Sequence, residues 1–196
     1  EKVREAAQAD IDLFGENRAQ EMRGNLLAGA YLDIPVHFIG HLQTNKVRQV
    51  VGQVAMIHSV DRDRLLNAIA REAASQGLVQ DILLQVNLAG EQSKAGIAPK
   101  DLRPLLERAA GFETLRVRGL MAIPPLTDTE ETARPYFAML RTLFEQAISW
   151  QLTGQHWDTL SMGMSDSFEA AILEGATLVR VGRQIFGERA GLRYVE

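Results

Sequence analysis

Small and hydroxyl-bearing residues follow two neighbouring apolar runs near the end of the chain. Ser165 and Asp166 come just after the run 159–163, and Gly182 ends the run 178–182. Serine and aspartate are good helix caps, and glycine lets the backbone approach a ligand closely. If each turn leads into a helix, two sets of unpaired backbone N–H groups face one place, which favours an anion. Either turn alone is explained by capping or bending, but the pair on consecutive runs predicts a phosphate site.

Arg180 adds a positive charge to this pair of turns. It lies in the middle of the run 178–182, with valines on the opposite face. If the valines pack against outer helices, the guanidinium points into the interior of the sheet. A buried arginine must be paired, because its desolvation is costly. Its partner is either a structural carboxylate, such as Asp166 or Glu174, or an acceptor on a ligand. The sequence leaves both open.

Strands of a parallel sheet are the elements that would position these turns. Seven short runs are apolar on successive positions, which is typical of strands buried on both faces. They span 11–15, 36–40, 54–60, 81–87, 115–123, 159–163 and 178–182. Because the carboxyl ends of parallel strands share one edge, we expect the two turns to lie close together.

Helical spacing separates the strands at 62–77, 99–112 and 128–152. Gly77 is typical of a helix carboxyl end, Thr127 or Asp128 can cap the third helix, and Pro135 marks its start or a kink. The alternation predicts βαβ units with right-handed crossovers. Seven strands after an opening helix fit an open doubly wound sheet or a (β/α)8 TIM barrel whose first strand is missing from this chain. No low-complexity linker divides the chain, so we expect a single domain over 1–196.

Composition excludes several classes of protein. The 196 residues are 46% hydrophobic and 23% charged, with a net charge of −4, so a general grip on nucleic acid phosphates is not expected. The absence of cysteine removes disulfides, thiolate metal ligands and thiol nucleophiles, and it fits a reducing compartment. No apolar run approaches the roughly twenty residues of a membrane span. No signal peptide is visible, and we expect a cytoplasmic protein.

The histidines do not predict a metal site. His37 and His41 are four residues apart, but the residues between them look like a strand end and a turn, so the two would not share a helix face. We therefore expect structural or pocket roles for both. His58, at the end of a strand, and His156, in a loop, are interpreted as packing or surface residues.

Six longer motifs extend across nearly the whole chain in a fixed order. They are FGENRAQE (14–21), HFIGHLQTNK (37–46), LLQVNLAGEQSKAGI (83–97), GLMAI (119–123), LSMGMSDSFEAAI (160–172) and VRVGRQIFGER (179–189). A lone SMGMS would be unspecific, whereas the series is highly specific. It resembles the pyridoxal phosphate homeostasis (PLP-binding) protein family, whose barrel is similar to the N-terminal domain of alanine racemase. The resemblance implies a single (β/α)8 barrel that holds pyridoxal 5′-phosphate (PLP), a form of vitamin B6, with no established turnover of its own.

The resemblance also implies which residues contact the phosphate of PLP. Ser161, Ser165 and Gly182 would do so, supported by the backbone at Met162 and Val181. These are the small and hydroxyl-bearing positions that the two turns already indicated. The cofactor phosphate would then occupy the predicted anion site.

The ring of PLP would meet a second group of residues. By resemblance, Arg180 faces the pyridine nitrogen, and a permanent cation there keeps that nitrogen unprotonated. PLP is then a poorer electron sink, which suits a carrier better than a broad catalyst. Asn17 and His37 would line the pocket, and Met121 would form part of its wall.

Two positions depart from the family pattern. The family holds PLP as a Schiff base on a lysine of the first barrel strand, upstream of FGEN, and this chain begins after that point. Its four lysines, Lys2, Lys46, Lys94 and Lys100, lie in helical or loop contexts, whereas a Schiff-base lysine is usually desolvated on a rigid element. We therefore expect weak, noncovalent binding of PLP by these residues. Arg183 stands where a small residue is expected, either adding charge near the phosphate or pointing to solvent.

Three functions compete. The favoured one is a PLP carrier in vitamin B6 homeostasis that is not an enzyme. We expect this carrier to act as a monomer, with PLP-dependent apoenzymes as candidate acceptors and without nucleic acid or membrane partners. A PLP-dependent amino-acid racemase is the alternative, but it needs a second base such as a tyrosine. Tyr31, Tyr136 and Tyr194 lie in helical or terminal contexts. A sugar-phosphate enzyme would need an acid–base pair, for which Glu16 and Glu91 are the plausible carboxylates.

Overall fold

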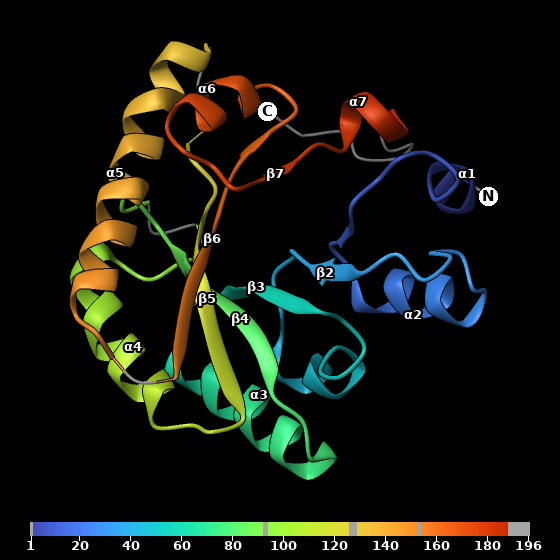
Figure 1. Cartoon of the computed structure of the whole chain (residues 1–196), viewed down its shortest axis with the longest axis horizontal. Coiled ribbons are helices and arrows are strands. Elements are labelled where there is room, and N and C mark those ends of the chain that lie inside the picture. Colours follow the sequence, from blue (N-terminus) through green and yellow to red (C-terminus); the bar gives the residue numbers. More distant parts are fainter. Residues whose placement is uncertain (1, 92–93, 126–128, 153, 188–196) are drawn as a thin grey trace.

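Seven parallel strands form one sheet that curves into a nearly closed barrel, with helices around its outer side (Figure 1). The computed structural model describes residues 2–91, 94–125, 129–152 and 154–187. The strands are β1 (Phe14–Glu16), β2 (Val36–Phe38), β3 (Met56–Val60), β4 (Gln80–Val86), β5 (Leu115–Ala122), β6 (Gln155–Met164) and β7 (Leu178–Arg180). They pair in chain order, whereas a doubly wound sheet reverses its order part-way. The seven strands and the barrel alternative are confirmed.

The three predicted helical stretches correspond to α3, to η2 with α4, and to α5 among the helices that cover the sheet. They are α1 (Lys2–Ala6), α2 (Ala19–Leu27), η1 (Thr44–Gln49), α3 (Asp63–Gln76), η2 (Pro99–Asp101), α4 (Leu102–Ala110), α5 (Glu130–Ser149), α6 (Phe168–Leu173) and α7 (Arg183–Phe186). Gly77 ends α3 with φ 65°, as predicted. Thr129 caps α5 in a reciprocal pair with Thr132, so the cap lies after the predicted Thr127 or Asp128, which are outside the described residues. Pro135 lies inside α5 rather than at its start.

Apolar side chains form two separate groups. The large one fills the space between the sheet and the helices, and Ile82 and Leu84 of β4 belong to it. The small one consists of Met56, Leu83 and Met121 from three strands. Leu83 lies between the two outward-facing β4 residues, so alternation along the strand points it inward. The barrel interior therefore contains a small apolar layer, and the other buried side chains described below are polar.

Gly119 changes which residues of β5 face the interior. The pairing registers of β5 with β4 and with β6 both shift near this residue, as in a β-bulge. Before the shift, Arg118 bonds to Asp81; after it, Met121 joins the interior apolar layer. The close approach requires glycine, because a Cβ atom at Gly119 would lie 1.8 Å from the Thr159 carbonyl oxygen. The bulge at Gly119 thus lets the charged Arg118 face the interior before it and the apolar Met121 face the interior after it.

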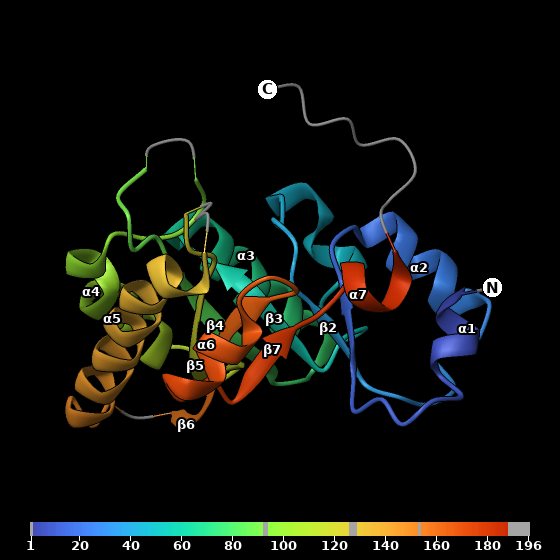
Figure 2. The same cartoon turned by 90° about the horizontal axis from the view of Figure 1, so that it is seen from above.

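The first and last helices meet on the same side of the molecule. Lys2 Nζ donates to the Phe186 carbonyl oxygen of α7 across 3.0 Å, and Figure 2 shows α7 on the side of α1 and α2. The described pairs of β1 and β7 are with β2 and β6 respectively. Among the described residues, every helix falls short of the length and apolar character that a membrane crossing requires. The prediction of a single domain over 1–196 stays a prediction.

Candidate functional site

A line of hydrogen-bonded polar side chains crosses the barrel interior. Arg180 Nη1 donates to Ser161 Oγ across 2.6 Å, and Arg180 Nη2 donates to the Ala122 carbonyl oxygen across 2.9 Å. His58 Nδ1 lies 3.1 Å from Ser161 Oγ, and His58 Nε2 lies 2.9 Å from His37 Nδ1. His58 is on β3 and Ser161 on β6, which are not neighbours in the sheet, so their bond spans the interior. We call His37, His58, Ser161 and Arg180 the interior chain.

Arg180 is a cation without a carboxylate partner among the described residues. Of the two predicted structural partners, Asp166 pairs with Arg183 and Glu174 pairs with Arg134. Of the two alternatives that the sequence left open, the structural carboxylate is therefore excluded at both of these positions. Desolvation lowers the pKa of Arg180 to about 10, so the guanidinium remains charged at neutral pH. No acidic side chain of the described residues therefore compensates the charge of Arg180.

The two imidazoles of the interior chain are neutral at pH 7. Burial, with a smaller contribution from the Arg118 guanidinium, lowers the pKa of His37 from 6.5 to about 4. Burial also lowers the pKa of His58 well below 6.5, with smaller contributions from His37 and Arg180. Neutral imidazole has one donor and one acceptor nitrogen, so the chain can carry directed hydrogen bonds.

The buried histidines predict a loss of stability in mild acid. Between pH 6.5 and about 4 the unfolded chain binds a proton at His37 that the folded chain does not. The contribution of His37 to the stability of the fold is therefore complete above pH 6.5 and is lost as the pH falls toward about 4. The lowered pKa of His37 corresponds to roughly 3 kcal/mol over that interval. Urea unfolding at a series of pH values should show this slope, reduced in His37→Gln and retained in His41→Gln, an exposed control. An unchanged slope in His37→Gln would contradict the assignment.

The two predicted turns do converge, but Ser165 does not cap the helix that follows it. Its Oγ accepts from the backbone N–H of Gly182 (3.3 Å) and of Arg183 (3.2 Å), at the start of α7. The cap position of α6 is Ser167, not Ser165 or Asp166 as predicted. Ser165 therefore holds the end of β7 against the turn after β6. The Arg183 guanidinium pairs with Asp166, which joins the same two turns.

The remaining predicted site residues occupy different surroundings. Asn17 is exposed in the turn after β1, and its carbonyl oxygen lies so near Gly40 that a Cβ there would be 2.0 Å away. Met121 is fully buried in the interior apolar layer. The side chain of Met162 lies in the outer core, and Val181 is half-buried. The structure thus joins Ser161, Arg180 and His37 in one hydrogen-bonded chain and Ser165 with Gly182 in one pair of turns.

Known proteins share both the sequence and the barrel. Residues 1–190 match the profile of the alanine racemase N-terminal domain family. The pyridoxal phosphate homeostasis protein of Aquifex aeolicus is 44% identical over 190 residues, which cover 96% of this chain and 82% of that protein. The chain belongs to the pyridoxal phosphate homeostasis protein family. The corresponding protein of Pseudomonas aeruginosa is 43% identical over 95% of this chain and 79% of its own length.

A solved structure from the same family has a similar fold. PipY of Synechococcus elongatus, determined with PLP bound, is 38% identical to this chain and superposes with a TM-score of 0.86. The alignment covers 94% of this chain and 86% of PipY. The resemblance predicted from the six motifs is confirmed.

His58 is the residue of this family member that the sequence did not indicate. Its full burial agrees with a packing role and excludes a surface one, but the hydrogen bonds that join it to His37 and Ser161 were not predicted. Its place two residues after the inward-facing Met56 is the signal that strand alternation offered. His156, by contrast, has a 67% exposed side chain and lies 3.2 Å from Asp158. In the described ranges, no three histidine or acidic residues gather as a metal site.

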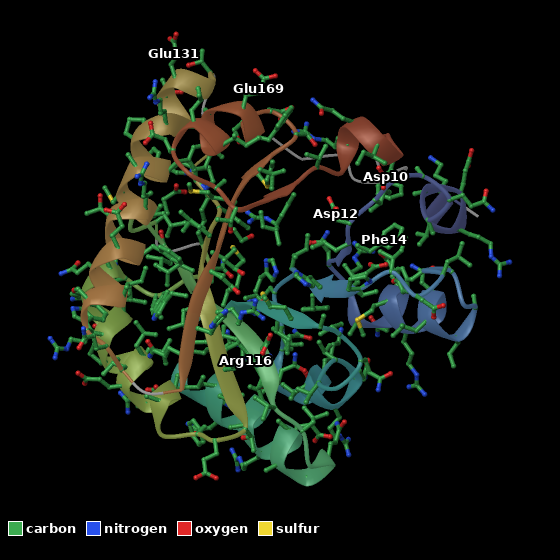
Figure 3. The ribbon with its side chains drawn as sticks, viewed as in Figure 1. Asp10, Asp12, Phe14, Arg116, Glu131 and Glu169 are labelled. Atoms are coloured by element: carbon green, nitrogen blue, oxygen red, sulfur yellow. The ribbon has the colours of Figure 1, made fainter. Side chains whose placement is uncertain are left out.

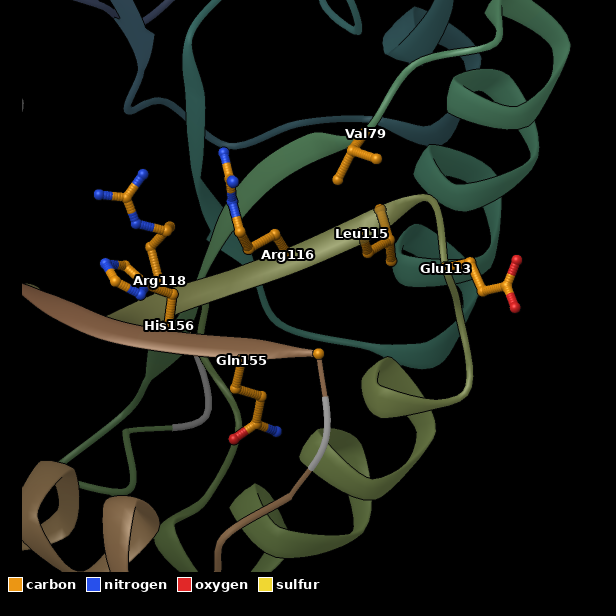
Figure 4. A pocket seen from close by; sticks show the side chains of 8 residues that line it. Val79, Glu113, Leu115, Arg116, Arg118, Gln155 and His156 are labelled. Carbon is orange, nitrogen blue, oxygen red and sulfur yellow. The ribbon is translucent and has the colours of Figure 1, made fainter.

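A cavity of about 490 Å³ lies at the other end of the strands (Figure 4). Its lining is Val79, Glu113, Leu115, Arg116, Arg118, Gly154, Gln155 and His156. Figure 3 places Arg116 near the amino end of β5, away from Glu169 on α6 beyond the carboxyl end of β6. Arg116 and Arg118 share Asp81 at 2.6 Å, and Arg118 also pairs with Asp158, so two carboxylates compensate the two guanidinium charges. Among the described residues of the interior chain, by contrast, Arg180 is a cation with no carboxylate partner.

Proposed function

We propose that this chain binds PLP at the carboxyl ends of β5, β6 and β7 and acts as a reversible PLP carrier in vitamin B6 homeostasis. Relatives with 44% and 43% identity bear the name pyridoxal phosphate homeostasis protein, and PipY has been determined with PLP bound. When bound, PLP supplies an aldehyde that reacts reversibly with amines. A carrier has to hold the cofactor without promoting further chemistry on it.

Arg180 is the observation that carries this proposal. Its guanidinium is charged and desolvated, and its partners among the described residues are a hydroxyl and a carbonyl, not a carboxylate. The pyridine nitrogen of PLP is an acceptor that this donor fits. A permanent cation there keeps the nitrogen unprotonated, which weakens PLP as an electron sink and favours storage over catalysis.

The turns after β6 and β7 supply groups that fit the phosphate. The N–H groups of Gly182 and Arg183 both point at Ser165 Oγ, which occupies the place of an anionic acceptor. We propose that these N–H groups and the Ser165 hydroxyl hold the phosphate, with the backbone at Met162 and Val181 beside them. Ser161 was also predicted to contact the phosphate. Its hydrogen bonds favour a role on Arg180 instead.

Asn17, His37 and Met121 are proposed to surround the ring. The four lysines of the chain lie outside the strands: Lys2 bonds to Phe186, Lys46 faces Gln20, Lys94 pairs with Glu91, and Lys100 is exposed on η2. None of these positions is a desolvated place on a rigid strand. We therefore propose that the residues of this chain bind PLP without a covalent bond.

A carrier role fits the two described tyrosines better than racemisation does, and Tyr194 lies outside the described residues. The Tyr31 hydroxyl donates to Glu16 across 2.5 Å, and burial together with this bond raises the pKa of Tyr31. Tyr136 lies on the outer helix α5. Neither is placed to move a proton at the carboxyl ends of the strands.

We propose a monomeric, cytoplasmic carrier that transfers PLP to apoenzymes.

Titration with PLP and with pyridoxal, which lacks the phosphate, tests the proposal. We expect PLP to bind at least about tenfold more tightly, because several charge-assisted hydrogen bonds are lost with the phosphate. Ser165→Ala should weaken PLP about tenfold by removing one of those bonds, followed by absorbance or calorimetry. Ser75→Ala, on the exposed surface of α3, is the matched control. Equal binding of PLP and pyridoxal by the wild type would refute the phosphate assignment.

A further inference from the structure

The ends of the interior chain determine the direction of its hydrogen bonds. Arg180 carries only donors, so Nη1 donates to the hydroxyl oxygen of Ser161 across 2.6 Å. The side chain of Ser161 is fully buried. Among the described residues, the acceptor within reach of its own hydroxyl proton is Nδ1 of His58, 3.1 Å away. Ser161 therefore accepts from Arg180 and donates to His58.

That donation determines the tautomers of both imidazoles. Nδ1 of His58 must be an unprotonated acceptor, so the proton of the neutral ring is on Nε2. Nε2 of His58 lies 2.9 Å from Nδ1 of His37, which must accept and carry its own proton on Nε2. Burial lowers the pKa of both rings, in agreement with neutral imidazoles.

We propose that His58 is a positioning residue that acts through the Ser161 hydroxyl on the cation Arg180. By taking the hydroxyl proton, His58 turns the lone pairs of Ser161 toward the guanidinium. The same bonds leave His37 with a protonated Nε2, a donor at the end of the chain. The part that concerns a ligand rests on the proposed function, whereas the tautomers follow from protein atoms alone.

Arg180 depends on this arrangement because few acceptors hold it. Its described partners are Ser161 on β6 and the Ala122 carbonyl on β5, so losing the orientation of Ser161 leaves one fixed bond. In the reverse direction, His58 would donate to Ser161. The Ser161 proton would then have no acceptor among the described residues in a fully buried place, which is unfavourable. The observed set of distances satisfies every group in only one direction.

Side-chain ¹⁵N–¹H correlation spectra of the ligand-free protein, with ¹⁵N-labelled histidine, test the tautomers. We expect both His37 and His58 to show a neutral ring protonated at Nε2, unchanged between about pH 6 and pH 8. The spectra of His37→Gln and His58→Asn provide the assignments. A ring protonated at Nδ1, or a charged ring, at either position would overturn the inference.

Two variants of His58 test its action on Arg180. His58→Asn keeps a side-chain oxygen acceptor for Ser161, whereas His58→Leu removes the acceptor and keeps similar volume. We expect His58→Leu to lower PLP affinity about tenfold and His58→Asn to restore most of it. His41→Leu, at an exposed histidine outside the interior chain, should bind as the wild type does.

The carbocyclic analogue of PLP, in which C–H replaces the ring nitrogen, separates positioning from a general loss of structure. The wild type should prefer PLP by about tenfold, and His58→Leu should bind both almost equally. An equal loss for both ligands in His58→Leu would mean a structural role and overturn the proposal. If His58→Leu does not fold, His58→Asn provides the test. A folded His58→Asn that no longer prefers PLP over the carbocyclic analogue would also overturn the proposal. If the wild type binds neither ligand, the proposed function fails, and the spectra still decide the tautomers.

Discussion

Arg180→Met should lower the affinity for PLP about a hundredfold while leaving the barrel folded. Truncating one partner of a buried, charge-assisted hydrogen bond typically costs 2–5 kcal/mol of binding, and a hundredfold corresponds to about 2.7 kcal/mol. Arg180 has no described carboxylate whose charge would be left unpaired by the change. Methionine also removes the cost of burying a cation. The loss should therefore appear mainly in binding, with a smaller effect on stability because Ser161 and the Ala122 carbonyl lose a donor.

Equilibrium titration and urea unfolding of the same samples measure the two effects separately. Arg180→Lys keeps the charge but not the planar pair of donors, so it should bind PLP about tenfold more weakly than the wild type. If Arg180→Met binds normally but unfolds at much lower urea, Arg180 is a structural residue and the ligand assignment is wrong.

Gly119→Ala should destabilise the chain by at least about 3 kcal/mol, the largest effect expected for a single methyl group here. The added Cβ would lie 1.8 Å from the Thr159 carbonyl oxygen, where Gly119 has φ 154°. The carbonyl oxygen belongs to the β6 backbone and the added Cβ is fixed directly to the β5 backbone, so neither can move without disturbing the pairing of β5 and β6. The shift would also displace Met121 and Ser161, which face each other across that pair.

Gly24→Ala is the matched control. Gly24 lies in α2, and nothing is within 4 Å of an added Cβ. Alanine is a better helix former, so this variant should gain about 0.5–1 kcal/mol. Urea midpoints of the two variants should therefore move in opposite directions. A Gly119→Ala protein with an unchanged midpoint would show that the bulge tolerates a side chain.

The strands could be predicted because buried parallel strands are apolar on successive positions. The start of β6 could not, since Gln155 and Asp158 are polar and extend the strand to 155 rather than 159. Asp158 is polar because it pairs with Arg118 of β5, a neighbour that only the folded sheet provides. Long-range partners of this kind leave no local pattern.

Most residues of the candidate site could be predicted individually, but their hydrogen-bond partners could not. Local cap chemistry predicted Ser165 for α6, whereas its hydroxyl serves the start of α7, 17 and 18 residues away. His58 looked like an isolated histidine because its partner Ser161 is 103 residues distant. Gly119 reverses the alternation of β5, so which side Met121 faces follows from the bulge and not from counting along the strand.

The sequential order of the strands determines which part of the barrel opens first. Each strand pairs with its neighbours in the chain, so every βα unit can add to a sheet that already exists. The central strands β4, β5 and β6 have 7, 8 and 10 residues, whereas β1 and β7 have 3 each. Local opening is therefore easiest at the short strands, while the centre stays intact. Because β7 carries Arg180 and leads to Gly182, the proposed PLP site is built partly on one of these short strands, where local stability is expected to be low.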